Sequence, residues 1–159
     1  MADKLENKKY DYKAMNVNLV EKVREVSATL DNMAKTRKIE WQINDDAIHM
    51  ILAEDSLVRM TLMNLMKNAI EAAPEGSKIT LDFQLQGKSS LCLINNEGKV
   101  SEAVKDRFFE KYFSWERPDG SGLGTYVSKL ITETQGGKIW YESSLEKGTT
   151  VFLEYKRLG

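Results

Sequence analysis

Residues 55–73 read DSLVRMTLMNLMKNAIEAA, and apolar residues occupy nearly every side of the helix that this stretch predicts. A helix that is apolar nearly all round is buried inside a domain. Pro74 and Gly76 follow directly and predict the end of the helix. We therefore expect a buried helix from about Asp55 to Ala73.

Four polar residues interrupt the apolar surface of this helix. Spacings of three, four and three residues stack them along one face, and they are Thr61, Asn64, Asn68 and Glu71. One interpretation is a stripe that faces solvent. The other is a cleft that holds phosphates and a hydrated cation, because an asparagine side-chain oxygen is a hard, neutral ligand suited to Mg²⁺. The spacing alone leaves both interpretations open.

The sequence on either side of this helix alternates between helical and strand patterns. Apolar residues from Leu19 to Met33 recur at helical spacing, and Asn18, with Glu21 three residues later, is typical of a helix start. A third helix is expected from about Leu123 to Thr134. Strands are expected at residues 38–44, 47–53, 78–86, 89–94, 138–143 and 149–156. Helices mixed with a sheet of about five strands predict an α/β sandwich, with the helices on one face.

The composition excludes several classes of protein. The chain has 159 residues, enough for one domain with its own core. Its 23 Lys and Arg against 24 Asp and Glu give a net charge of −1, which provides no basic surface for nucleic acid. A single cysteine, Cys92, excludes a disulfide framework. No apolar run is long enough to cross a membrane and no leader opens the chain, so we expect a soluble, intracellular domain. Residues 1–15 are expected to be a tail, a linker or an expression remnant.

Three further segments contain residue types that suit a nucleotide site. The run Gly120-Ser121-Gly122-Leu123-Gly124-Thr125 opens the third helix, where backbone N–H groups can approach a phosphate, although a flexible loop explains the glycines equally well. The run Asn95-Asn96-Glu97-Gly98 ends a strand and is either a surface turn or a place where a side chain reads a base. Residues 107–113, RFFEKYF, form either a core helix or a mobile lid whose cations meet phosphates.

Two single residues are predicted to be structural. His49 is the only histidine, and no Ser, Cys or acid pattern marks it as a catalytic base. Cys92 lies within a buried-strand pattern, where a free cysteine behaves as a small apolar residue.

The order of these segments resembles a known family. Asn-x-x-x-Asn-Ala on a buried helix is followed by a strand ending in a polar turn, by Phe-Phe-Glu-Lys-Tyr, by a Gly-x-Gly-x-Gly helix start and by a final Gly-Thr-Thr strand. This order resembles the catalytic, ATP-binding domain of sensor histidine kinases, in the GHKL superfamily that includes type II topoisomerases, Hsp90 and mismatch-repair ATPases. The resemblance covers about Val17 to Tyr155. It implies the Bergerat fold, a two-layer sandwich with a mixed, mostly antiparallel sheet of about five strands, about three helices on one face and a mobile ATP lid.

The resemblance also implies which residues bind Mg-ATP. Asn68 would be the Mg²⁺ ligand and Asn64 its neighbour at the phosphates, and these two would be the catalytic residues. The lid would contribute its aromatic residues and Arg117, which stands where the family often has a lysine that touches the terminal phosphate. The full set of ATP-binding residues that the resemblance implies is Asn64, Asn68, Glu71, Ala72, Asn95, Phe109, Phe113, Arg117, Gly120, Ser121, Gly122, Leu123, Gly124 and Thr149.

One motif departs from the family pattern. The family's first glycine box reads Asp-x-Gly-x-Gly, and its Asp accepts a hydrogen bond from the adenine amino group. The aligned residues here are Asn95-Asn96-Glu97-Gly98-Lys99, which places Asn95 at the Asp and replaces both glycines. An amide offers an acceptor oxygen but also an NH₂ group that could meet the carbonyl of guanine. This alignment predicts weaker adenine discrimination and lower affinity.

A second departure bears on the reaction. The ATP-hydrolysing members and the anti-sigma serine kinases have a glutamate as general base at the position of Asn64, and an amide cannot take a proton at neutral pH. We therefore expect phosphoryl transfer to a histidine on a separate dimerisation domain, with little hydrolysis. Residues 16–159 would form a cytoplasmic catalytic domain that does not autophosphorylate alone. It would serve a response regulator through that dimerisation domain, without contacting nucleic acid or the membrane. The alternatives are a degenerate interaction module without catalysis and an anti-sigma-type serine kinase.

Overall fold

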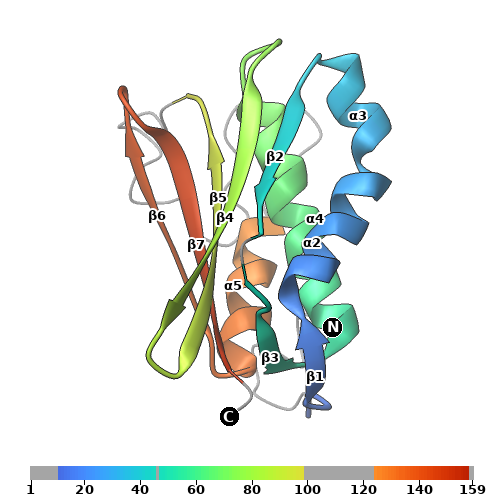
Figure 1. The fold of residues 1–159 in the computed structure, drawn as a ribbon, viewed down its shortest axis with the longest axis vertical. Coiled ribbons are helices and arrows are strands. Elements are labelled where there is room, and N and C mark those ends of the chain that lie inside the picture. Colours follow the sequence, from blue (N-terminus) through green and yellow to red (C-terminus); the bar gives the residue numbers. More distant parts are fainter. Residues whose placement is uncertain (1–10, 46, 99–123, 158–159) are drawn as a thin grey trace.

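The computed structural model describes residues 11–45, 47–98 and 124–157, which form a layer of helices on one face of a five-stranded sheet (Figure 1). The sheet has the strand order β2-β4-β5-β7-β6, in which β2 and β4 are parallel and the other neighbours antiparallel. Its strands are β2 (Glu40–Asn44), β4 (Lys78–Gln86), β5 (Ser89–Asn96), β6 (Lys138–Ser144) and β7 (Gly148–Lys156). The helices are α2 (Leu19–Thr29), α3 (Asp31–Thr36), α4 (Asp55–Ala72) and α5 (Gly124–Thr134). The predicted two-layer sandwich with a mixed, mostly antiparallel sheet is confirmed.

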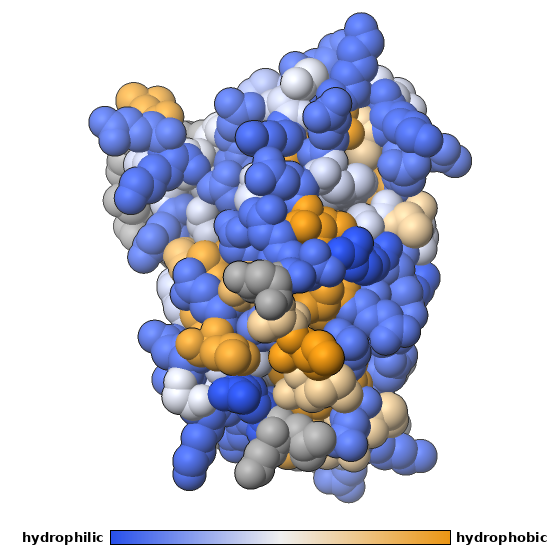
Figure 2. Space-filling view, viewed as in Figure 1, coloured by the Kyte–Doolittle hydropathy of each residue, from blue (hydrophilic) through white to orange (hydrophobic). Residues whose placement is uncertain are grey.

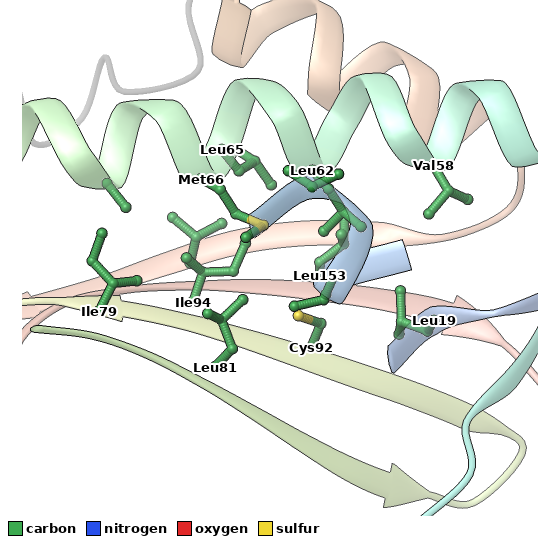
Figure 3. Packing of buried hydrophobic residues seen from close by; sticks show 14 of the residues in the cluster. Leu19, Val58, Leu62, Leu65, Met66, Ile79, Leu81, Cys92, Ile94 and Leu153 are labelled. Atoms are coloured by element: carbon green, nitrogen blue, oxygen red, sulfur yellow. The ribbon is translucent and has the colours of Figure 1, made fainter. Parts of the chain in front are cut away.

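The helix expected over residues 55–73 is α4, and it occupies the centre of the core. Figure 3 shows Leu62 and Met66 of α4 pointing toward Leu81, Ile94 and Leu153 of the sheet. All five side chains are at most 1% exposed. Burial of side chains of this size stabilises a fold by about 1.5–3 kcal/mol each, so this interface accounts for the position of α4 against β4, β5 and β7.

The start of α2 agrees with the sequence, but its end does not. The backbone N–H of Glu21 donates to Asn18 Oδ1 at 3.1 Å, which caps the helix as predicted. The helix then ends at Thr29, because Leu30 has φ −91° and ψ 4°, and α3 begins at Asp31. The apolar spacing continues across this point, so a single helix to Met33 was the wrong expectation.

The residues just before α2 form an additional strand. β1 (Met15–Asn18) pairs antiparallel with β3 (Met50–Ala53) in a separate two-stranded sheet. Further upstream, the backbone N–H of Lys13 donates to Glu54 Oε1 at 2.8 Å. Tyr12 packs against Leu57 and Ile131. The end of the segment expected to be a tail or linker therefore contacts the start of α4 and the C-terminal part of α5.

The face of the molecule drawn in Figure 2 is mostly hydrophilic, and most of its apolar residues lie near one another. Figure 2 shows most of the apolar residues of this face in its middle and lower parts, with another at the upper left corner. Ile48 and Leu85 are among the exposed large apolar residues, at 75% and 51% exposure. In the part of the chain that the structure describes, no helix is long and apolar enough to cross a membrane.

Candidate nucleotide site at the end of the sheet

The helix-facing side of the sheet becomes polar at one end. Asn96 of β5 lies opposite Thr149 of β7, which lies opposite Ser143 of β6. The next row along the same face contains Ile94 and Val151 of these strands, and both belong to the apolar core. Side chains on alternate strand residues share a face, so the polar row continues the core face where β5 ends and β7 begins, at the upper end of the sheet in Figure 1.

Hydrogen bonds hold this polar row and the residues after β5. Thr149 Oγ1 donates to the carbonyl oxygen of Gly98 at 2.7 Å and lies 2.9 Å from Ser143 Oγ. Asn96 Nδ2 donates to the carbonyl oxygen of Glu97 at 2.7 Å. Asn96 is only 5% exposed. The orientation of its amide is therefore set by a neighbour that can only accept a hydrogen bond.

Two glycines permit close backbone contacts around these residues. Gly148 has φ +72°, and a Cβ atom there would lie 2.2 Å from the carbonyl oxygen of Asn96. Gly98 has φ +108°, and a Cβ atom there would lie 3.4 Å from the carbonyl oxygen of Ala72. The positive φ angles favour glycine at both positions. The start of β7 thus packs directly on the end of β5, and Gly98 lies next to the end of α4.

The polar face of α4 leads toward Gly98. Asn64, Asn68 and Ala72 follow at spacings of four residues, which places them along one side of the helix. Asn64, Asn68 and Glu71 are half-buried and Ala72 is exposed, whereas Thr61 is fully buried. The predicted stripe is therefore neither wholly buried nor a simple solvent face. Its C-terminal end lies beside the residues that follow β5.

Asn95 does not belong to this group, because it lies on the opposite face of the sheet from Asn96 and Thr149. β5 continues through Asn96, two residues beyond the expected strand end, so Asn95 points to the face of the sheet away from the helices. Its Nδ2 donates to the carbonyl oxygen of Lys147 at 2.8 Å and to Thr150 Oγ1 at 2.9 Å. The amide of Asn95 thus attaches β5 to the start of β7 on the outer face.

A known protein family matches the part of the chain that contains this site. The family model described as histidine kinase-, DNA gyrase B- and HSP90-like ATPase matches residues 53–158. This range includes α4, the polar end of the sheet and β7. The chain belongs to this ATPase family.

Relatives in the same family are sensor kinases. Sensor protein DegM from Bacillus sp. strain B21-2 is 31% identical over 137 residues, covering 86% of this chain and 36% of DegM. The chain spans about a third or less of the length of the first curated relatives it matches. The catalytic domain of histidine kinase ThkA, in a nucleotide-free form, matches with a TM-score of 0.81 and 25% identity, covering 91% of this chain and 96% of that domain. ThkA in complex with the response regulator TrrA matches in fold, with a TM-score of 0.78 and 23% identity over 99% of this chain and 46% of that one. The chain is thus an ATPase domain of the sensor histidine kinase type.

The position of Asn96 changes how the family motif aligns. Asn96-Glu97-Gly98 fits the Asp-x-Gly part of the first glycine box, with Asn96 at the Asp and the first glycine retained as Gly98. Neither Asn96 nor Ser143 was among the site residues predicted from the sequence. The unbroken apolar run from Leu91 to Ile94 does not reveal which residues of the strand face the helices. Residues two apart on a strand share a face, so Asn96 is the residue after Ile94 that lies on the core-facing side.

Several predicted site residues of this ATPase domain lie outside the described residues. They are Phe109, Phe113, Arg117, Gly120, Ser121, Gly122 and Leu123, together with the whole of the expected lid, about Lys99 to Ser121. Gly124 is the first residue of α5, close to the expected helix start at Leu123. Thr149 takes part in the polar row, whereas its contact with nucleotide stays a prediction.

The two residues that were predicted to be structural lie in the core. His49 is 1% exposed, its Nδ1 lies 3.2 Å from Ser90 Oγ and its ring centroid 5.4 Å from that of Phe83. Cys92 is fully buried, and burial raises the pKa of its thiol far above the usual range. Neither residue lies on the polar end of the sheet.

Exchange of Asn95 for aspartate distinguishes the alignment that places Asn95 at the Asp of the first glycine box from the alignment that places Asn96 there. Asn95→Asp is expected to leave the preference between ATP and GTP unchanged and to lower the free energy of unfolding by about 1–2 kcal/mol. The reason is that a carboxylate cannot donate to the Lys147 carbonyl oxygen that the amide now contacts. Denaturant unfolding and nucleotide titration of the same variant measure both effects. Tighter ATP binding relative to GTP in this variant would return residue 95 to the base site.

Proposed function

We propose that this chain binds Mg-ATP and donates the γ-phosphoryl group to a histidine on a separate dimerisation domain in two-component signal transduction. The observation that carries the proposal is the polar end of the sheet, where Asn96, Gly98 and Thr149 adjoin the end of α4. This end offers groups for a base, and the neighbouring face of α4 offers amides for phosphates and a cation. A nucleotide carries a base at one end and phosphates at the other, so it could contact both groups of residues at once.

Asn96 is the proposed base-reading residue in place of Asn95. A carbonyl oxygen can only accept a hydrogen bond, so the contact with the Glu97 carbonyl oxygen requires that the amide nitrogen of Asn96 face it. Its Oδ1 is then directed away from that contact, and no described residue donates a hydrogen bond to it. An acceptor held in this way suits the amino group of adenine and disfavours the carbonyl group of guanine. This orientation of the Asn96 amide favours adenine over guanine. The weaker discrimination predicted from the sequence assumed an amide that could present either its oxygen or its NH₂ group to the base.

Asn96→Ala is expected to reduce the affinity for ATP by about threefold to tenfold and to remove most of the preference over GTP, because one hydrogen bond to the base is lost. Calorimetric titration with both nucleotides measures the change. Asn95→Ala is the matched control, because it removes the neighbouring amide from the other face of the same strand. Equal preference in the Asn96→Ala variant and the unmodified chain would contradict the assignment.

The phosphate end is proposed on α4 and in the segment before α5. Asn68 would hold Mg²⁺ and Asn64 would contact the phosphates, since half-buried amide oxygens are hard, neutral donors that fit a cation shared with phosphate oxygens. When bound, Mg²⁺ neutralises charge on the transferring phosphoryl group. Glu71 and Ala72 would line the same face. The lid and loop residues proposed to contact ATP are Phe109, Phe113, Arg117, Gly120, Ser121, Gly122, Leu123 and Gly124.

The proposed reaction is transfer rather than hydrolysis. The ATP-hydrolysing members of the superfamily that this chain resembles have a glutamate at the position of Asn64. The amide of Asn64 cannot accept a proton from an attacking water molecule. A presented histidine is itself a nucleophile when its imidazole is neutral. Catalysis would then depend on positioning and on charge stabilisation, and hydrolysis by the isolated domain would be slow.

The proposed setting is a longer sensor kinase. Residues 16–159 would be the catalytic domain, and residues 1–15 a linker whose last residues are attached to it through Tyr12 and Lys13. The proposed partners are the dimerisation domain of the parent protein and, through it, a response regulator, in the cytoplasm. Two alternatives stay open, a non-catalytic interaction module and an anti-sigma-type serine kinase, and Asn64 disfavours the second.

Phosphotransfer to a supplied acceptor tests this proposal. The chain is mixed with the histidine-bearing dimerisation domain of the parent protein and with ATP labelled at the γ-phosphate. The expected result is label on that domain that is stable in base and labile in acid, as for phosphohistidine, and none when its histidine is replaced. Acid-stable label on a serine would support the serine kinase alternative. Nucleotide binding without any transfer would support the interaction module.

A further inference from the structure

A short chain of hydrogen bonds crosses three strands at the polar end of the sheet. It runs from Ser143 of β6 to Thr149 of β7 and on to the carbonyl oxygen of Gly98, just after β5. Thr149 is 6% exposed and Ser143 is half-buried. Ser143 lies one strand further from Asn96 than Thr149 does, so it acts on the base end only through Thr149.

The direction of these hydrogen bonds follows from the number of protons available. Thr149 has a single hydroxyl proton, and the Gly98 carbonyl oxygen, which has none, requires it at 2.7 Å. The 2.9 Å contact between the two hydroxyls must then be donated by Ser143. Ser143 therefore occupies a lone pair of Thr149 and keeps the proton of Thr149 directed toward Gly98.

The position of Gly98 matters because three parts of the proposed site meet there. Its Cα lies against the carbonyl oxygen at the end of α4, where a Cβ atom would lie 3.4 Å from Ala72 O and 3.9 Å from Asn96 Nδ2. Glu97, whose carbonyl oxygen orients the Asn96 amide, directly precedes Gly98. A shift of the Gly98 carbonyl would therefore turn the peptide groups that orient Asn96.

We infer that Ser143 is a positioning residue for base recognition, which acts through Thr149 and Gly98 to keep the Asn96 acceptor directed at the amino group of a 6-aminopurine nucleotide. This inference rests on the proposed nucleotide site. It assigns Ser143 a role in specificity, without contact between Ser143 and the ligand.

The test compares ATP with purine riboside triphosphate, which lacks the 6-amino group, by titration of the full chain with Mg²⁺ present. The unmodified chain is expected to bind ATP about tenfold more tightly than the analogue. Ser143→Ala is expected to reduce this ratio by about threefold, mainly through weaker ATP binding, because the affinity for the analogue does not depend on the acceptor. Ser143→Thr retains a hydroxyl on a residue that suits a strand and is expected to restore the ratio.

Ser144→Ala is the matched control. Ser144 Oγ accepts a hydrogen bond from the Lys147 backbone N–H in the turn before β7, so its loss affects local stability but not the ratio. An unchanged ratio in Ser143→Ala, or an equal loss of affinity for both nucleotides, would overturn the role of Ser143 and leave the nucleotide site intact. Should Ser143→Ala not fold, a ratio in Ser143→Thr that differs from the unmodified ratio by threefold or more would overturn it. An unmodified chain that binds neither nucleotide would overturn the proposed function itself.

Discussion

Asn68→Ala is expected to weaken Mg-ATP binding by about a hundredfold while the domain stays folded. The proposed role of Asn68 is to supply a side-chain oxygen to the cation, and polar contacts to charged groups contribute about 1.5–3 kcal/mol each. Alanine has the highest helix propensity and Asn68 is half-buried within α4, so the helix itself should persist. Calorimetric titration with and without Mg²⁺ measures the loss, and circular dichroism checks the fold.

Asn32→Ala provides the matched control for this variant. Asn32 is an exposed asparagine on another helix, α3, so the same change there should leave both the affinity and its dependence on Mg²⁺ unaltered. If Asn68→Ala also bound ATP with unaltered affinity and Mg²⁺ dependence, the cation would have to be held by other residues.

Gly148→Ala is expected to cause the largest loss of stability among the variants considered, about 3–5 kcal/mol. An alanine at φ +72° costs about 1–2 kcal/mol in backbone strain, and its Cβ would lie 2.2 Å from the Asn96 carbonyl oxygen. Because that oxygen is backbone, β5 and β7 must move apart to relieve the contact. A loss of 3 kcal/mol lowers the melting temperature by about 10 °C in a domain of this size, and thermal unfolding followed by circular dichroism measures the shift.

A second glycine separates the two causes of this loss. Gly87 has φ +59°, but no atom lies within 4 Å of the position its Cβ would take. Gly87→Ala should therefore show the backbone cost alone, about 1–2 kcal/mol. Similar losses in the two variants would show that the close approach of Gly148 to Asn96 does not hold the end of the sheet together.

The helices and strands that were predicted well are those whose apolar pattern and terminating residues match what the structure buries. The expected range 55–73 and the observed α4, Asp55–Ala72, differ by one residue, because Pro74 and Gly76 interrupt a strong apolar pattern. β4 matched fully at residues 78–86. β1 was not predicted, because four residues carry too little pattern and its strand character comes from pairing with β3.

The sequence indicated which polar residues share a face of α4, but it did not indicate which residue at the end of β5 lies on the helix-facing side of the sheet. Helical spacing alone places Asn64 and Asn68 on one face, whereas the face of a strand residue depends on where the strand ends. The expected end at Ile94 allowed Asn95 to point into the site, and two more residues of pairing with β7 placed Asn96 there instead. The role of Ser143 depends on the register between β6 and β7, which no motif in the sequence specifies.

The central claim, that this domain binds Mg-ATP, is tested most directly by calorimetric titration of the unmodified chain with ATP and ADP, each with and without Mg²⁺, and with GTP as the specificity control. We predict saturable binding of both adenine nucleotides, stronger with Mg²⁺ and weaker for GTP. No binding at millimolar nucleotide, or binding that ignores both Mg²⁺ and the base, would contradict the claim.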